Sequence, residues 1–399
     1  MIPGALQGVK VYFINAKFVV GIKLLVLIAF QHPASSIQHP VSSIQYPAPG
    51  SPTRLICLIG NEKIYLKVSN IKLTLKKIKQ SDMKKIGVLF GKERSFPEAF
   101  IERVNSKNVS GVMAEPVRID KVMQGEPSGY AVIFDRISQD VPFYRAFLKN
   151  AALCGTTVIN NPFWWSADEK FFNNCLATKI DVPVPKTVIL PSRDLPADTS
   201  DESFSNLAYP MDWEGIFNYI GFPAYMKPYA GGGWKSVYQL NSMEEFFEKH
   251  AETEQLVMML QEEIKFDEYY RCYCIGGKYV RIMPYEPRNP HHLRYVADFK
   301  PSPERYKLME DIVLRICHYL GYDFNTVELA LRDGVPYAID FCNPAPDAEV
   351  SSVGQENFDW VVETAATYAI EKALEHKDKA DNLTWGEYIK KSAAKKKLY

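Results

Sequence analysis

From Lys85 onward, short apolar runs and longer stretches of helical period follow one another along the chain. Apolar runs at residues 86–90, 131–134 and 157–159 predict buried strands, and the stretches 97–105 and 143–154 predict helices between them. Strands that alternate with helices at this spacing are typical of a small parallel sheet. The pattern therefore predicts an α/β fold that begins near Met83.

The first 82 residues do not share this pattern. Residues 31–49 repeat a seven-residue unit that is rich in proline, and proline at this density blocks regular pairing. The apolar stretch 18–30 before it is interrupted by Lys23, which leaves it too short and too charged for a typical membrane span. We interpret residues 1–82 as a low-complexity extension, non-native or disordered, with a signal peptide or anchor as the alternative.

The break at Asn160-Asn161-Pro162 separates two predicted domains. Residues 83–160 hold the predicted parallel sheet, and residues 161–378 form the second domain, which a linker strand at 188–190 enters. Apolar residues at helical spacing between 358 and 375 predict a packing helix near its end. Residues 379–399 are predicted to form a basic tail.

The charge balance narrows the choice of ligand. Residues 1–82 hold 10 Lys and Arg against 2 Asp and Glu, so the remainder holds 37 against 45 and carries a net charge of −8. Broad binding of nucleic acid needs a basic face, so we expect a small ligand and no nucleic acid. The seven cysteines are odd in number and include no CxxC pair, which predicts reduced thiols in a cytoplasmic protein without a zinc site.

A glycine-rich segment follows a predicted strand in the second domain. The apolar pattern at 224–226 leads to Lys227 and then to Gly231, Gly232 and Gly233. Because glycine has no Cβ, such a loop can bring backbone N–H groups against phosphate oxygens while lysine neutralises their charge. The alternative is a flexible hairpin, since the segment is neither a Walker A sequence nor GxGxxG.

A second apolar run ends in a polar and acidic group. Residues 256–260 are followed by Gln261, Glu262, Glu263 and Ile264, with Glu268 shortly after them. A strand that ends in carboxylates can present backbone groups and one acid to the edge of an adenine ring. The alternative is a solvated strand end.

A third segment carries the residue types of a magnesium site. Two apolar patterns flank the turn signal Asp333-Gly334, so Glu328 and Asp340 can lie opposite one another, with Asn343 just beyond. Two carboxylates and an amide oxygen form a hard, oxygen-only site that suits Mg²⁺. An acid in an apolar strand is costly to bury unless a cation pairs with it, which favours the metal-ligand interpretation.

These segments, taken in order with Lys170 at the start of a helical stretch, resemble the ATP-grasp superfamily. The resemblance is to the branch of glutathione synthetase, D-alanine:D-alanine ligase and the RimK-like ligases, and it covers residues 83–377. For Lys170 alone, an exposed helix lysine is the alternative. The resemblance implies an ATP-grasp fold with α+β lids that clamp ATP in residues 161–378, and a Rossmann-like pre-ATP-grasp domain before them.

The resemblance also implies a nucleotide site. Lys170 and Lys227 would contact the phosphates of ATP, residues 261–264 would form the adenine hinge, and Glu268 would contact the ribose. Glu268 stands one position earlier than the family pattern places this acid.

The implied metal ligands for Mg²⁺ or Mn²⁺ are Glu328, Asp340 and Asn343. The family has one residue between the second acid and the asparagine, whereas two separate Asp340 from Asn343, and aspartate replaces the more common glutamate. This departure brings Asp347 into consideration as a further ligand.

The activity that the resemblance implies is ATP-dependent, ADP-forming ligation of a carboxylate to an amine or thiol through an acylphosphate. Arginine binds oxyanions bidentately, so we expect Arg281 and Arg294 to be catalytic, with Arg288 as a further candidate. His291 or His292 is a candidate proton carrier. The expected partners are a small-molecule carboxylate and an amine, with no membrane for the folded body, and a homodimer is compatible with this. A small-molecule kinase and a non-catalytic ATP sensor are the alternatives.

Overall fold

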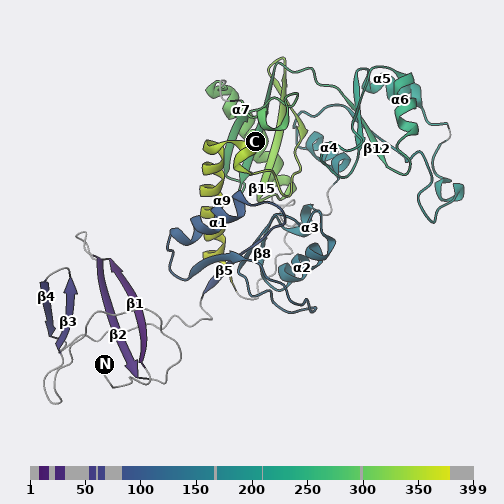
Figure 1. Cartoon of the computed structure of the whole chain (residues 1–399). Coiled ribbons are helices and arrows are strands. Elements are labelled where there is room, and N and C mark those ends of the chain that lie inside the picture. The colour runs from purple at the N-terminus through teal and green to yellow at the C-terminus, as the bar shows by residue number, and fades with distance from the viewer. Residues whose placement is uncertain are drawn as a thin grey trace, which may run out of the picture. The chain divides into compact units, whose positions relative to one another are not determined.

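A computed structural model of the chain (Figure 1) describes residues 83–165, 169–208, 210–296 and 300–377, together with four strands between residues 9 and 67. The chain divides into two compact units, Met1–Lys77 and Ile78–Tyr399.

The described part of the first unit consists of two antiparallel hairpins. β1 (Val9–Lys17) pairs with β2 (Lys23–Gln31), and β3 (Arg54–Ile59) pairs with β4 (Glu62–Lys67). The proline-rich repeat from residue 32 onward and the predicted basic tail lie outside the described residues. In the parts of the chain that the structure describes, no helix has both the length and the apolar character needed to cross a bilayer.

The second unit begins with a four-stranded parallel sheet in the order β6-β5-β7-β8. Its elements are β5 (Lys84–Leu89), α1 (Ser95–Ser106), β6 (Val112–Pro116), β7 (Val132–Asp135), α2 (Pro142–Leu153) and β8 (Thr157–Ile159). The predicted parallel sheet and its two helices are therefore confirmed. The edge strand β6 was not predicted from the sequence, because Glu115 and Pro116 interrupt its short apolar run.

Aromatic rings join the parallel sheet to the later part of the chain. Phe96 and Phe100 of α1 contact Phe134 of β7, and Phe324 stacks on Phe96 with ring centroids 5.8 Å apart. Phe324 begins β15 (Phe324–Arg332). All four rings are fully buried, so this cluster fixes the parallel sheet against β15.

A second sheet is antiparallel and has the order β11-β10-β12-β9. Its strands are β9 (Thr187–Leu190), β10 (Ala224–Pro228), β11 (Tyr238–Leu240) and β12 (Met258–Glu262). Helices α5 (Trp213–Ile220) and α6 (Met243–Ala251) pack on it (Figure 1), with Phe217 and Phe246 in contact in their shared core. Asp212 and Ser242 cap the two helices, because each side chain accepts a backbone N–H of the first turn.

A third sheet, also antiparallel, has the order β14-β13-β15-β16. The remaining elements of the unit are α3 (Pro162–Trp165), α4 (Lys170–Lys179), β13 (Glu268–Ile275), β14 (Tyr279–Pro284), α7 (Pro303–Leu320), β16 (Val335–Asp340), α8 (Val350–Val353), α9 (Gln355–Glu375) and two short 3₁₀ helices, Asp201–Phe204 and His291–Leu293. Helix α9 is the predicted packing helix. Helix α7 starts at Pro303 after the capping residue Ser302 and ends at Leu320, and its C-cap Gly321 has a φ of 71°, which favours glycine.

The alternation of side chains along β13 decides which residues meet the rest of the molecule. Tyr270, Cys272 and Cys274 are buried in one core with α7, whereas Tyr273 is buried in another core with α9. Successive side chains of a strand point to opposite faces, so Tyr269 and Arg271 share the face of Tyr273. This face also carries Glu328, because Arg271 and Glu328 are paired in the register of β13 and β15.

Candidate active site

Two carboxylates face one another across the β15–β16 hairpin. Glu328 and Asp340 are partners in the register, and an irregularity in the pairing follows directly after Glu328. The hairpin turns at Asp333 and Gly334, which have φ values of 54° and 75°. The turn signal in the sequence therefore predicts this pairing correctly, and it brings two negative charges close together.

Lys170 supplies the first positive charge. It is the first residue of α4, and its Nζ lies 3.1 Å from Oδ1 of Asp340. Its backbone N–H donates to the carbonyl of Tyr229, at 3.0 Å, in the loop that follows β10. The attraction of Asp340 raises the pKa of Lys170 above its ordinary value, so this lysine stays charged.

Lys227 supplies the second positive charge, from β10 in the other antiparallel sheet. Burial, together with repulsion by Lys170, lowers the pKa of Lys227 to about 8. Asp340 and Glu328 act in the opposite direction. Lys170, Lys227, Glu328 and Asp340 therefore lie within electrostatic reach of one another, although they come from four different elements.

The two carboxylates differ in their environments. Burial raises the pKa of Glu328, and the attraction of Arg271 offsets only part of this rise. Burial also acts to raise the pKa of Asp340, but Lys170 and Lys227 outweigh it and hold that pKa below its ordinary value. Asp340 is 40% exposed and ionised, whereas Glu328 is 17% exposed and accepts a hydrogen bond of 2.6 Å from the Tyr269 hydroxyl.

Asn343 lies beside β15. Its backbone N–H donates to Oδ1 of Asn325 at 2.9 Å, and its side-chain amide donates to the carbonyl of Thr326 at 3.3 Å. Thr326 is two residues before Glu328, on the same face of the strand. Among the described residues, no group of three or more His, Cys, Asp and Glu side chains is placed to hold a metal ion. The predicted ligand set, with its two carboxylates, depends on Asn343 for its third oxygen.

Arg271 is a charged residue of this site that the sequence analysis did not single out. Its guanidinium is 13% exposed and lies 3.5 Å from Oε1 of Glu328, and it stacks over the ring of Tyr285 at 5.5 Å. Its Nε is buried without a hydrogen-bond partner in the described structure. A charge in the middle of the apolar run Tyr270–Ile275 was the available signal, because such a charge is costly to bury without a partner.

The residues predicted to form the adenine hinge end β12 and have protein partners. Gln261 donates to the Thr187 hydroxyl at 2.9 Å, Glu262 accepts from Arg332 at 2.7 Å, and Glu263 accepts from Gln239 at 2.7 Å. Ile264 is buried in a small core with Tyr269 and Tyr285. The segment therefore bridges the two antiparallel sheets, and its contact with adenine stays a prediction.

Glu268 lies on the other face of the third sheet from Glu328. It accepts hydrogen bonds from Arg305 of α7 and, at 2.7 Å, from the Tyr270 hydroxyl. Strand β13 begins at Glu268, whose side chain therefore shares the face of Tyr270. Glu268 is thus not brought together with the carboxylate and lysine cluster by any contact in the described structure.

The three glycines form an open, exposed loop between β10 and β11. Gly231 and Gly233 have φ values of 96° and 73°, which favour glycine. A Cβ added to Gly231, Gly232 or Gly233 would meet no atom within 4 Å. The loop therefore has room to take a ligand against its backbone.

The predicted catalytic arginines lie at two places. Arg281 of β14 donates to Asn357 at 2.6 Å and pairs with Glu356 at 2.7 Å, and both partners belong to α9. Arg294 donates to the carbonyl of Asn289 at 2.9 Å and lies 3.5 Å from the Tyr285 hydroxyl, which also accepts from Arg271 at 3.4 Å. Arg294 thus adjoins the cluster through Tyr285, whereas Arg281 is held by α9.

The remaining candidates are Arg288, the two histidines and Asp347. Arg288 is 71% exposed and pairs with Glu286 at 2.6 Å. His292 is exposed, and the side chain of His291 lies outside the described residues. The backbone carbonyl of Asp347 accepts from the Tyr273 hydroxyl, and its carboxylate accepts from Ser352.

The structure also has a pocket of about 570 Å³, which lies at the parallel sheet. Leu89, Val117, Arg118 and Phe143 are among its lining residues, and none of the cluster residues is. The candidate site is therefore defined by contacts between charged side chains and not by this cavity.

Comparisons with known proteins show which fold this arrangement has. No protein-family model and no curated protein matches the chain. Among solved structures, it is similar to the ATP-grasp ligase PsnB complexed with minimal precursor, Mg and ADP, at 14% identity and a TM-score of 0.51, over 72% of this chain and 98% of that chain.

Two ligases of known source give the same result. D-alanine–D-alanine ligase from Bacillus anthracis complexed with ATP is 16% identical with a TM-score of 0.50, over 73% of this chain and 98% of that one. VanG D-Ala:D-Ser ligase from Enterococcus faecalis is 14% identical with a TM-score of 0.52, over 73% and 99%. At such identities a likeness concerns the fold, and the chain has the α/β ATP-grasp fold of these ligases.

Proposed function

We propose that this protein is an ATP- and Mg²⁺-dependent ligase that joins a carboxylate to an amine, or to a thiol, and releases ADP and phosphate. One observation carries the proposal: Lys170, Lys227, Glu328 and Asp340 converge from four elements into one charged cluster. A triphosphate and a divalent cation have the charges that would complete such a cluster.

The residues of the cluster fit a divalent cation. Glu328, Asp340 and Asn343 offer only oxygen ligands, and the ionised Asp340 is 40% exposed. Oxygen ligands suit Mg²⁺, and Mn²⁺ accepts the same set. When bound there, the cation would offset the negative charge of the β- and γ-phosphates during transfer.

ATP would be held from two sides in this proposal. The glycine loop with Gly231, Gly232 and Gly233 would place backbone N–H groups against the phosphates, and residues 261–264 would contact the adenine. The room around the three glycines supports this. Glu268 would need to leave Arg305 to reach a ribose, so this contact is the least supported.

The chemistry would run in two steps. An oxygen of the substrate carboxylate attacks the γ-phosphorus, the bond between the γ-phosphorus and the bridging oxygen breaks, and ADP leaves. Lys170 and Lys227 would hold the phosphate oxygens during this step. The amine then attacks the acyl carbon of the acylphosphate and loses a proton, and inorganic phosphate leaves with the electrons of the C–O bond.

Arginine side chains near the cluster would bind the substrate carboxylate or the transferred group. Arg271 is the best placed, because it adjoins Glu328 and its Nε has no partner among the described residues. Arg294 shares the Tyr285 hydroxyl with Arg271, which supports a role beside it. Arg281 would first need to release Glu356 and Asn357.

Two observations that do not concern the charged cluster also support the proposal: the ligands of similar solved structures and the state of the cysteines. The similar ligases have structures complexed with ATP, or with Mg and ADP. The six cysteines of the second unit are free thiols, which supports a cytoplasmic location.

Product analysis tests the proposal. The full chain is incubated with ATP, Mg²⁺ and pooled amino acids and small peptides, and the products are identified by mass spectrometry. We expect ADP and phosphate release that requires both a carboxylate and a nucleophile, and loss of this release in Asp340→Ala and Asn343→Ala. A stable phosphorylated product without a nucleophile would show a kinase instead. Tight ATP binding without turnover would show a sensor.

A further inference from the structure

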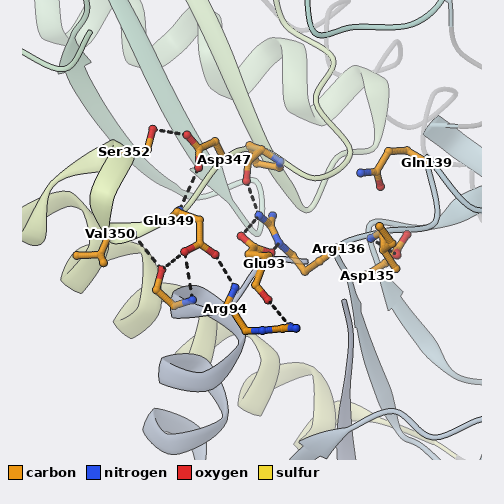
Figure 2. Close-up of polar contacts among 12 residues, drawn as sticks. Glu93, Arg94, Asp135, Arg136, Gln139, Asp347, Glu349, Val350 and Ser352 are labelled. Carbon is orange, nitrogen blue, oxygen red and sulfur yellow. Dashed lines mark hydrogen bonds and ion pairs between the residues drawn. The ribbon is translucent and has the colours of Figure 1, made fainter. Parts of the chain in front are cut away.

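Three loops that are far apart in the sequence meet around Arg136 and Glu349 (Figure 2). The first follows β5 and carries Glu93 and Arg94, and the second follows β7 and begins with Arg136. The third comprises residues 341–349, between β16 and α8, and we call it the Asn343 loop. It leaves β16 directly after Asp340.

Arg136 joins all three loops. Its side chain is 2% exposed, and its Nε and Nη2 donate to the two carboxylate oxygens of Glu93 at 2.8 and 2.6 Å. The same Nη2 donates to the carbonyl of Pro346 at 2.6 Å. Its guanidinium also lies over the rings of Phe96 and Phe324, at 5.0 and 5.4 Å, which fixes its orientation.

Glu349 joins the far end of the Asn343 loop to helix α1. Its carboxylate accepts the backbone N–H groups of Arg94 and Ser95 at 2.7 and 3.2 Å, and the Ser95 hydroxyl at 2.6 Å. These donors stand at the start of α1, where the free N–H groups and the helix dipole favour a negative charge. Figure 2 shows Glu349 pointing toward Arg94, with Arg136 and Glu93 beside them.

Asn343 itself is held by β15, and the part of the Asn343 loop that follows it has partners outside the loop. Pro344 and Pro346 have no N–H group, so the loop cannot hold itself with backbone donors at these positions. Their carbonyls are held instead by Asn160, at 2.8 Å, and by Arg136. Both of these residues belong to the part of the chain that forms the parallel sheet.

We propose that Arg136 and Glu349 are positioning residues of the cation site: they fix the Asn343 loop so that Asn343 stands beside Glu328 and Asp340. The inference rests on the proposed function, since it concerns the same cation. Neither residue is among the proposed ligands of the cation. Their effect passes along the loop, which is anchored at both ends and carries Asn343 three residues before Pro346.

If Arg136 and Glu349 had only a structural role, their substitution would have a different effect. Such a role would hold α1 against the rest of the unit, and the substitution would affect folding without changing the affinity for a cation. The chain offers a matched control, because Glu363 of α9 accepts hydrogen bonds from Arg103 of the same helix α1 and from its C-cap residue Lys107. The hydrogen bonds and ion pairs of Glu363 in the described structure go to Arg103, Lys107 and Thr367, and none of these residues belongs to the Asn343 loop.

The test compares three variants of the full chain: Glu349→Gln, Arg136→Lys and the control Glu363→Gln. ADP binding is measured by titration calorimetry at a series of Mg²⁺ concentrations, and the melting temperature is measured in parallel. Mg²⁺ should increase the affinity for ADP, and the half-saturating Mg²⁺ concentration of this increase is the quantity compared. We expect Glu349→Gln and Arg136→Lys to raise that concentration about 10-fold, because the loss of residues that support metal ligands weakens metal binding to this extent. Glu363→Gln should leave it unchanged, and ADP affinity without Mg²⁺ should be equal in all variants.

Three results would overturn the inference. These are an unchanged Mg²⁺ requirement in both Glu349→Gln and Arg136→Lys, an equal shift in the control, and an equal loss of ADP affinity without Mg²⁺. If Arg136→Lys does not fold, Glu349→Gln alone decides, because glutamine keeps the size of the side chain. If the wild-type protein itself binds ADP without any dependence on Mg²⁺, the proposed function fails, and that result is distinct from the other three.

Discussion

Lys227 combines burial with a neighbouring positive charge, and this makes it sensitive to a phosphate ligand. With a pKa of about 8, it is mostly neutral at about pH 9 in the free protein. Phosphate oxygens would raise that pKa again, so nucleotide binding should take up a proton at this pH. The affinity for ATP should therefore fall as the pH rises above 8.

Calorimetry of ATP binding in two buffers of different ionisation enthalpy measures this proton uptake. The uptake should vanish in Lys227→Met. The same lysine should affect folding, because its pKa in the unfolded chain is the ordinary 10.5. The unfolded state then binds the extra proton between pH 8 and 10.5, so the stability of the wild-type protein relative to Lys227→Met should rise with pH across this window. Equal behaviour of both proteins would contradict the burial of Lys227.

Arg271 and Glu328 form a second testable pair. Both side chains are more than four-fifths buried. The substitution Arg271→Met removes the guanidinium and leaves the buried carboxylate of Glu328 without its charged partner. We expect the free energy of unfolding to fall by about 3–5 kcal/mol. Arg271→Lys keeps the charge and should lose less. Urea denaturation at neutral pH measures both, and a loss below about 1 kcal/mol in Arg271→Met would mean that the pair contributes as little as an exposed one.

For single residues, the sequence predicts partners that are close in the chain better than partners that are distant. Glu328 and Asp340 face one another as predicted, because a two-residue turn fixes a local register. Arg271 pairs with Glu328, which lies 57 positions later in the chain, and the sequence around Arg271 does not predict this partner. The placement of Glu268 follows from the alternation of side chains along β13, which begins at Glu268.

Among the elements, the glycine loop between β10 and β11 makes the clearest prediction. Gly232 has an ordinary backbone conformation, and a side chain there would meet no atom within 4 Å in the free protein. Gly232→Val should therefore leave the melting temperature unchanged. If the loop closes on phosphates, the added side chain should weaken ATP binding about 10-fold or more, because a Cβ prevents close approach of the backbone. Unchanged ATP affinity would show that the loop does not contact the nucleotide.

Elements with strong periods were predictable, and those that depend on distant partners were not. Strand β8 and the helices α1, α2, α4 and α9 lie where the sequence indicates. Strand β6 is stabilised by its parallel pairing with β5, which a sequence pattern does not display. The run 188–190 appeared as a linker strand, but it is β9, the edge of a sheet that pairs with β12.

The whole molecule separates into two compact units, and the candidate site belongs to the second. We therefore expect a shortened chain that begins at Met83 to bind ATP and Mg²⁺ as the full chain does, with an unchanged melting temperature of that unit. Differential scanning calorimetry and nucleotide titration compare the two chains. A large loss of affinity in the shortened chain would assign residues 1–82 a part in the site.

The order of motifs along the chain predicted the ATP-grasp fold better than any single motif did. Each segment alone had an ordinary alternative, such as a flexible hairpin or a solvated strand end. The structure joins Lys170 and Lys227 to Glu328 and Asp340 through two sheets and one helix, so the convergence depends on tertiary packing. The contacts of Arg136 and Glu349 with the Asn343 loop depend on it even more, since they link residues more than 200 positions apart.

A crystal structure of the full chain with Mg²⁺ and a non-hydrolysable ATP analogue would locate the nucleotide and the cation. We expect phosphate oxygens within hydrogen-bond distance of Lys170 and Lys227, and a cation bound by Glu328, Asp340 and Asn343. A nucleotide bound elsewhere, or a cation that avoids both carboxylates, would contradict this expectation.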